Sequence, residues 1–283
     1  MNTKSTFQPA MASAFVLFAV PAFAGGPARQ TFDVGLKDPV VLDLAVAAGD
    51  VRMTYSRDGQ LSVNVSAQDT RAKEISEEFL ASGMTVEQDG PHIRIRTLPN
   101  RFPGNPPKVS YQIDVPSRTE VNAAILGAGN LTVIGITGPA TLRTAEGKIS
   151  CTRVRGQLYA ETGSGNIVLI QNGPSRAVVK AGLGSIDAVA ARGNLFASTD
   201  KGDVHIKAVL WDTWQVTSRS GNIRIEMPAE TKFDLDAETV SGSISVERDD
   251  MQKPTRGIHK LHQQVNGGGS RVSVHTAGNI FVQ

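Results

Sequence analysis

Residues 147–169 read GKISCTRVRGQLYAETGSGNIVL, and they hold one full period of the repeat that decides the fold. The period starts with Gly147-Lys148-Ile149, and the same pattern of glycine, polar residue and aliphatic residue returns at Gly165. The other copies start at Gly129, Gly184, Gly202, Gly221, Gly242 and Gly278. The first seven copies are 18, 18, 19, 18, 19 and 21 residues apart, and the eighth follows after 36. A near-constant period of this length is typical of a repeat fold.

Each period contains two runs of alternating apolar residues. Ile149 and Cys151 form the first run, and Leu158 and Ala160 form the second run nine residues later. Alternation with period two predicts a strand with one buried face. Eighteen residues of extended chain span ~60 Å at ~3.3 Å each, enough for one closed turn, and such turns stack at ~4.8 Å. The repeat therefore predicts an all-β fold, a β-solenoid (β-helix) of ~18-residue coils in which Cys151 and Trp214 point inward.

The first part of the chain does not follow this period. Residues 25–128 are predicted to form an N-terminal β-rich cap segment, because they contain several short alternating runs. One short helix is expected over residues 70–82, where Ala72, Ile75 and Phe79 fall on one face at helical spacing. The cap interpretation follows from the rule that terminal units of repeat folds differ from the inner ones.

Residues 129–283 are assigned to the β-solenoid repeats, with a loop insertion at 249–269. This inserted stretch is polar, ends in Gly-rich sequence and breaks the period. A last coil, residues 271–283, is expected to follow the insertion and to end the stack. An early coil can also begin at Gly49, which is followed by Asp50 and Val51 in the same pattern as the repeats.

The N-terminus has the features of a signal peptide, residues 1–24. Lys4 precedes an apolar run, and Ala22-Phe23-Ala24 has the small-x-small form of a cleavage site. The run is too short to span a membrane as a helix. We therefore expect an exported protein, periplasmic or secreted, with no membrane insertion after signal cleavage. The 29 basic and 27 acidic side chains are scattered, so no nucleic-acid partner is expected.

Several motifs together resemble the bacterial putative-adhesin domain family. They are the segment Tyr111-Gln112-Ile113-Asp114-Val115-Pro116, the run from Val121 to Gly129, the tandem Ser/Thr-x-x-Gly-Asn/Asp/Ser-Ile coils, and the closing sequences around Gly267 and Gly278. The resemblance spans nearly the whole chain after the signal peptide. It implies a single-stranded β-helix after an N-terminal β-rich segment, and a domain of unknown function without shared catalytic residues. The adhesin role is an implication of this resemblance alone.

Candidate functional residues are few. Asp187, His205 and Arg224 occupy the third position after the glycine in successive coils, so they are predicted to form one outward column with side chains ~5 Å apart. A solvated ladder of alternating charge is the favoured interpretation, because no neighbouring column supplies the carboxylate pair that glycoside chemistry needs. Trp211 is expected at a coil corner, where packing is favoured over contact with a sugar or a protein. No catalytic residue, metal site or cofactor is predicted.

These observations predict a non-enzymatic exported cell-envelope protein with an adhesin-like binding or scaffold role. Its partner would be a protein or polysaccharide of the cell envelope. One alternative is a carbohydrate-active β-helix enzyme that uses Asp187 and its neighbours. The other alternative is an accessory protein of envelope stress or envelope assembly.

Overall fold

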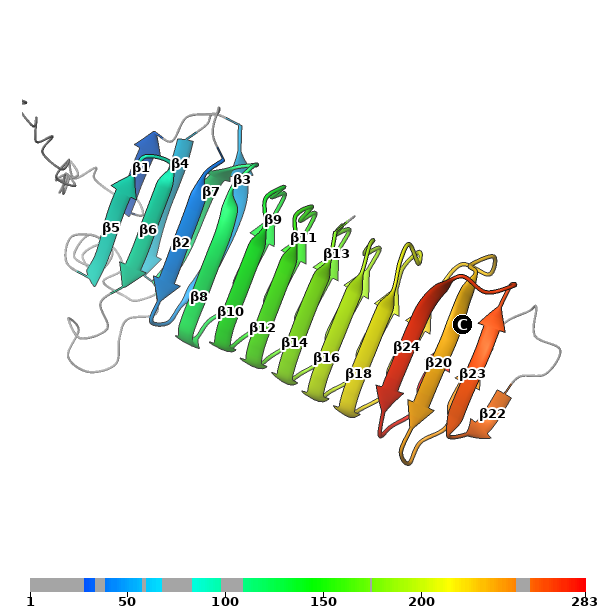
Figure 1. Cartoon of the computed structure of the whole chain (residues 1–283). Coiled ribbons are helices and arrows are strands. Elements are labelled where there is room, and N and C mark those ends of the chain that lie inside the picture. The colour runs from blue at the N-terminus through cyan, green and yellow to red at the C-terminus, as the bar shows by residue number, and fades with distance from the viewer. Residues whose placement is uncertain are drawn as a thin grey trace, which may run out of the picture.

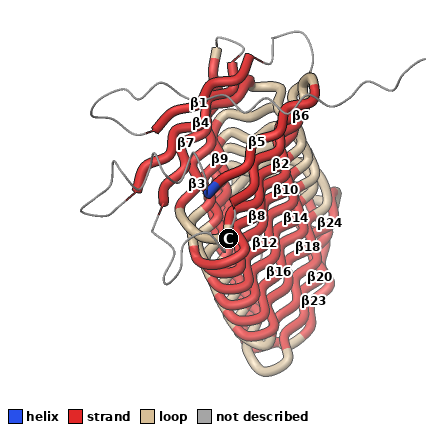
Figure 2. Tube along the Cα trace, turned by 90° about the vertical axis from the view of Figure 1, so that its left-hand side faces the viewer, coloured by secondary structure: helices blue, strands red, loops and turns tan. Residues whose placement is uncertain are grey.

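The computed structural model describes residues 28–33, 39–57, 60–67, 83–97, 109–173, 175–247 and 255–283. The elements of these residues are all strands, in one sheet of 13 strands and one of 12. The two sheets face each other along an elongated prism (Figures 1 and 2). The expected all-β architecture is confirmed, and the stack of parallel strands is solenoid-like.

The first sheet, sheet A, carries the short strands. In spatial order its strands are β1 (Ala28–Asp33), β4 (Gln60–Ala67), β7 (Val109–Pro116), β3 (Asp50–Ser56), β9 (Leu131–Ile134), β11 (Ile149–Thr152), β13 (Ile167–Ile170), β15 (Ile186–Val189), β17 (Val204–Lys207), β19 (Ile223–Glu226), β25 (Ile280–Val282), β21 (Ile244–Val246) and β22 (Thr255–Ile258).

The second sheet, sheet B, carries the longer strands. Its order is β23 (Lys260–Val265), β20 (Phe233–Thr239), β24 (Ser270–Thr276), β18 (Trp214–Ser220), β16 (Leu195–Lys201), β14 (Ala177–Leu183), β12 (Leu158–Ser164), β10 (Ala140–Glu146), β8 (Glu120–Ala128), β2 (Val41–Val46), β6 (His92–Thr97) and β5 (Met84–Asp89). One coil of the stack therefore consists of one strand from each sheet.

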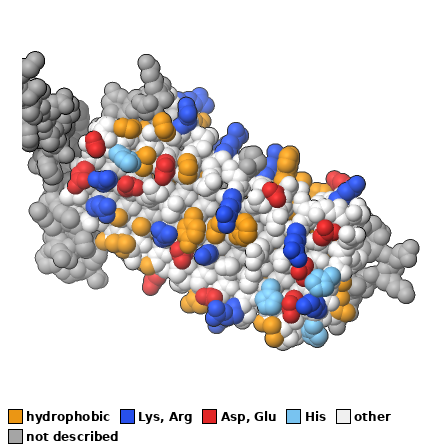
Figure 3. Space-filling view, viewed as in Figure 1, with side chains coloured by type: hydrophobic (Ala, Val, Ile, Leu, Met, Phe, Trp, Pro, Cys, Tyr) orange, Lys and Arg blue, Asp and Glu red, His pale blue; other side chains and the backbone are white. Residues whose placement is uncertain are grey.

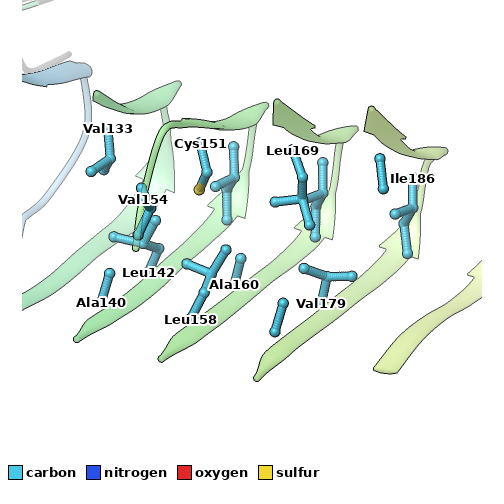
Figure 4. Close-up of a cluster of buried hydrophobic side chains, with 14 of the residues drawn as sticks. Val133, Ala140, Leu142, Cys151, Val154, Leu158, Ala160, Leu169, Val179 and Ile186 are labelled. Carbon is cyan, nitrogen blue, oxygen red and sulfur yellow. The ribbon is translucent and has the colours of Figure 1, made fainter. Parts of the chain in front are cut away.

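The repeat determines the register of the stack. Ile149 pairs with Leu131 on one side and with Ile167 on the other, so equivalent positions of successive coils lie next to each other. The inward side chains of both sheets meet in one core of aliphatic residues (Figure 4). Cys151 and Trp214 are buried in it, as the alternation predicts, and the Trp214 indole N–H donates to the carbonyl of Gly193 at 3.2 Å.

The repeated motif has two physical functions at the corner between the sheets. A Cβ atom on Gly184 would overlap the carbonyl oxygen of Gly165 in the preceding coil, and the φ angle of Gly184 is +148°. At five of the eight motif glycines, a Thr or Ser hydroxyl three residues earlier donates to the glycine carbonyl of the adjacent coil, and at Gly278 the donor is two residues earlier. Thr162 donates to Gly147 in this way at 2.9 Å. Both features tie consecutive coils together at one corner.

The N-terminal segment contains a coil of its own. β2 pairs with β8 and β3 pairs with β9, both in parallel, so residues 41–56 form a layer of the stack. This layer contains Gly49, the position at which an early coil was expected. The helix expected over residues 70–82 lies outside the described residues, and Gly83 is the one described residue with helical backbone. The structure therefore gives no support for the predicted helix.

The C-terminal end is not arranged as expected. The last coil, β24 and β25, does not end the stack but lies between the coil of β18 and β19 and the coil of β20 and β21. Figure 1 shows red β24 between yellow β18 and orange β20. The hydroxyl ladder confirms the order, because Thr276 donates to Gly221 and Thr239 donates to Gly278, each at 2.6 Å. Coils seven and eight are therefore exchanged relative to their order in the sequence.

The segment expected to be an inserted loop, residues 249–269, carries two strands rather than loop alone. β22 pairs antiparallel with β21, and β23 pairs antiparallel with β20, so they cover the end of both sheets. The predicted signal peptide, residues 1–24, lies outside the described residues. In the part of the chain that is described, no helix is long and apolar enough to cross a membrane.

Candidate functional site

The predicted outward column lies on sheet A. Asp187 on β15 pairs with His205 on β17, and His205 pairs with Arg224 on β19. The His205 Nδ1 atom is 3.8 Å from the Asp187 carboxylate, at the outer limit of an ion pair. The structure therefore brings the three predicted residues together in one row.

Glu226 lies in the next outward column, where it pairs with Lys207, and its carboxylate reaches the basic members of this row; the sequence interpretation missed it. Its carboxylate lies 3.2 Å from His205 Nε2, 3.1 Å from Lys207 Nζ and 3.0 Å from Arg224 Nε. The hydrogen bond from Lys207, helped by those from His205 and Arg224, lowers the pKa of Glu226 to about 2, against the effect of desolvation. The period of two was the available signal, because Glu226 is two residues after Arg224 and so points to the same side.

This network suits structure better than catalysis. A general acid needs a pKa near the working pH, and Glu226 stays ionised far below neutral pH. Its two oxygens are already engaged by three basic side chains. Arg224 is further fixed by the side-chain oxygen of Gln283, which accepts its hydrogen bond at 2.9 Å. The arrangement agrees with the interpretation of the column as a ladder of paired charges.

Trp211 lies apart from this row, in the connection between β17 and β18. Its side chain is 58% exposed, and the guanidinium group of Arg192 lies 5.3 Å from the ring centroid. A cation over an indole face at this distance is a favourable contact. Trp211 thus contacts a basic side chain of the preceding coil and keeps more than half of its surface exposed.

The outer face of sheet B carries a second group of aromatic and basic side chains. Tyr159 on β12 lies under the guanidinium group of Arg143 at 5.1 Å and the ammonium group of Lys180 at 5.7 Å. Phe196 on β16 lies under Arg176 at 4.7 Å. Figure 3 shows hydrophobic and basic side chains side by side across the middle of this face. These five residues are called the aromatic–basic strip below.

The strip follows from the registry of the coils. Tyr159 and Phe196 occupy the same outward position two coils apart, because each pairs with Val178 between them. Arg143 and Lys180 flank Glu161 in the neighbouring column. The signal was present in the sequence as aromatic residues at the outward position of the second run.

Other reactive groups are engaged inside the stack. Burial raises the pKa of the Cys151 thiol to about 12, which makes it a poor nucleophile. Asn172 lies in the same core, where its amide accepts from the Val154 N–H at 2.9 Å and donates to the Cys151 carbonyl at 3.2 Å. Within the described residues, no group of three or more His, Cys, Asp and Glu side chains is placed to hold a metal ion.

Comparisons with known proteins agree with this architecture. Residues 40–283 match the family model described as Toastrack DUF4097. No curated protein matches the chain. The crystal structure of a putative adhesin from Bacteroides fragilis NCTC 9343 is 14% identical, covers 90% of this chain and 96% of its own, and superposes with a TM-score of 0.51. This likeness shows the fold.

Two further solved structures are similar to the chain over most of their length. A putative adhesin from Parabacteroides merdae ATCC 43184 is 12% identical, with 92% of this chain and 97% of that chain covered and a TM-score of 0.39. A putative lipid binding protein from Parabacteroides distasonis ATCC 8503 is 13% identical, with 92% and 98% covered and a TM-score of 0.34.

Proposed function

The chain belongs to the Toastrack DUF4097 family, and from this premise we propose that it is a non-enzymatic exported protein whose sheet faces bind an envelope polymer. The resemblance to a putative-adhesin domain family of unknown function is confirmed by this membership and by the adhesin-like fold. A binding or scaffold role fits both. The expected signal peptide supports export, to the periplasm or beyond the cell.

The aromatic–basic strip carries the proposal. Arg143, Lys180 and Arg176 place three positive charges around two aromatic rings, and the coils beneath hold them in fixed register. They outnumber the one negative charge among them, Glu161, which pairs with Arg143 at 3.4 Å. Rigid aromatic and arginine side chains are the groups that dominate binding surfaces. Their positive charge favours an anionic polymer, so we propose an acidic polysaccharide of the envelope as the partner.

Binding of soluble polygalacturonate, with neutral dextran as the comparison, tests the proposal. Removing Tyr159 and Phe196 together by alanine substitution is expected to weaken polygalacturonate binding by at least tenfold, since stacked rings carry much of such contacts. Arg143→Ala with Lys180→Ala should do the same and should flatten the salt dependence. Arg219→Ala serves as the matched control, because Arg219 is exposed, pairs with Asp200 and lies outside the strip.

Three results would contradict the proposal. Equal binding by the wild type and the Tyr159/Phe196 variant would remove the strip from the interaction. If the protein depolymerises any polysaccharide and Asp187→Ala abolishes that activity, the protein is an enzyme. Capture of a specific protein from periplasm, with no polysaccharide binding, would instead favour the accessory role in envelope stress or assembly.

A further inference from the structure

A polar hollow lies at the end of the stack where the order of the coils is exchanged. Its volume is about 280 Å³, and it is lined by Asp234, Leu235, Asp236, His262, Gln263, Gln264 and Arg271. These side chains come from β20, β23 and β24, and β24 lies beside β20 because the last coil is inserted between β18 and β20. Ligand pockets start at ~300 Å³, so this hollow suits one small unit.

Asp236 organises the hollow. Its Oδ1 atom is 3.0 Å from His262 Nδ1, and its Oδ2 atom is 3.5 Å from an Arg271 guanidinium nitrogen. The two basic side chains are more than half exposed, and both line the hollow. Asp236 is thus a positioning residue that holds donors at two sides of the space.

Asp234 supplies a hydrogen-bond acceptor, in contrast to the donors held by Asp236. Its Oδ1 atom is buried and, among the described residues, has no hydrogen-bond partner. A buried acceptor without a donor costs ~1–3 kcal/mol, and more when it is charged. Gly268 packs closely against this oxygen, since a Cβ atom there would lie 2.7 Å from it. Gln264 adds an exposed amide, which can both donate and accept.

From this arrangement we infer that the hollow is a binding site for a single sugar unit, held through its hydroxyl groups. A sugar hydroxyl donates and accepts at once, and the hollow offers carboxylate acceptors beside guanidinium, imidazole and amide donors. A multivalent metal ion fits less well, because Arg271 would repel it. A phosphate fits less well, because two carboxylates face the same space.

The site also lies where the regular ladder is broken. Here polar groups of three strands converge on one space, and one of these strands, β23, runs antiparallel to its neighbour. Insertions in repeat proteins place their extra residues on a binding face. The hollow is independent of the aromatic–basic strip, which lies on β10 to β16 of the same sheet.

The test uses the full mature chain and saturation-transfer NMR with glucose, galactose, mannose and glucosamine as probes. At least one sugar is expected to bind with a Kd in the millimolar range, since one small unit offers few contacts. Asp234→Asn should weaken that binding about tenfold, because it replaces an acceptor by a donor. Gln264→Ala should weaken it about threefold, and Gln264 is exposed, so the fold is not at risk.

Asp200→Asn is the matched control, because it makes the same chemical change at an exposed residue that pairs with Arg219 and lies outside the hollow. It should leave sugar binding unchanged, as should the Tyr159/Phe196 variant of the strip. Binding of a free sugar but not of its polymer identifies a solute as the ligand, and binding of both identifies a chain end or branch. Failure of all four sugars to bind, or equal binding by Asp234→Asn, would overturn the inference. Loss of polygalacturonate binding alone would not overturn it, because that result concerns the aromatic–basic strip.

Discussion

The close approach of successive coils predicts which glycines cannot be replaced. Three alanine substitutions separate the two reasons for glycine, which are overlap of a Cβ atom with the next coil and a positive φ angle. Gly184→Ala adds a Cβ atom that overlaps the Gly165 carbonyl oxygen at a φ of +148°. Gly129→Ala makes the equivalent overlap with Gly49, but its φ is outside the left-handed region. Gly267→Ala meets nothing within 4 Å, although its φ is +89°.

The steric cost can be worked out from the hydrogen bonds beside each glycine. The new Cβ atom would lie 2.5 Å from the Gly165 carbonyl carbon, or 2.7 Å from that of Gly49. Carbon atoms prefer ~3.5–4.0 Å, so the two coils must separate locally by about 1 Å.

Three hydrogen bonds cross between the coils on that side of Gly184. They are Gly165 N–H to Leu183 O at 2.7 Å, Ile167 N–H to Ser185 O at 2.9 Å and Ser185 N–H to Asn166 Oδ1 at 2.9 Å. Three equivalent bonds flank Gly129. Losing three at ~0.5–1.5 kcal/mol each costs ~1.5–4.5 kcal/mol.

The positive φ adds ~1–2 kcal/mol for alanine. The expected losses in the free energy of unfolding are therefore ~1–2 kcal/mol for Gly267→Ala, ~1.5–4.5 for Gly129→Ala and ~2.5–6.5 for Gly184→Ala. Urea unfolding followed by far-ultraviolet circular dichroism measures all three, provided that the m value stays constant. If Gly129→Ala costs no more than Gly267→Ala, close packing of the coils is not what requires glycine.

Three further predictions concern single side chains of the stack. Glu226 has a folded pKa of about 2 against an ordinary 4.5. Its ionised form therefore stabilises the folded chain fully above about pH 4.5, and this contribution is lost as the pH falls toward 2. The Tm difference between wild type and Glu226→Gln should be present at pH 7 and shrink to near zero at pH 2. Cys151 should not react with a thiol reagent at pH 8 until urea unfolds the chain, and fast labelling of the native protein would contradict its burial. Asn172→Ala leaves the Val154 N–H and the Cys151 carbonyl without their partner, so a loss of ~2–4 kcal/mol is expected in urea unfolding, and an unchanged midpoint would argue against those two bonds.

Much of the fold could be predicted because one physical rule operates in every coil. A strand that faces a core on one side alternates, and a corner that passes under its neighbour excludes a Cβ atom. Ile149, Cys151 and Trp214 therefore lie where the alternation places them. The row of Asp187, His205 and Arg224 could be predicted for the same reason, since equal positions in successive coils are neighbours.

The rest of the candidate surfaces depended on information that a period does not contain. Glu226 was missed because only the column of Asp187, His205 and Arg224 was considered. Glu226 lies two residues further along the strand, and its carboxylate contacts side chains of that column. Lys207 and Arg224 meet on Glu226 only because long side chains bend toward a shared carboxylate. Side-chain direction of that kind is set by packing and charge rather than by spacing.

The exchanged coils show where spacing along the chain stops being a guide to order in space. The corners at Gly221, Gly242 and Gly278 carry the same motif, so any of them fits against any other, and local sequence cannot choose between the possible stackings. One trace of the exchange is present, because the interval of 21 residues before Gly242 is the longest of the first six. Two or three added residues are enough to cross one more layer of ~4.8 Å.

The exchange also links the polar hollow to the completion of the fold. Asp234 and Asp236 belong to β20, whereas Arg271 belongs to the coil of β24 and β25, which follows β20 in the sequence. Until residues 270–283 insert, β20 lacks the neighbour that supplies this guanidinium group. A ligand of the hollow binds only the completed arrangement, so by mass action it must stabilise that arrangement against withdrawal of the last coil. The most irregular part of the stack is therefore also the part whose stability a ligand can change.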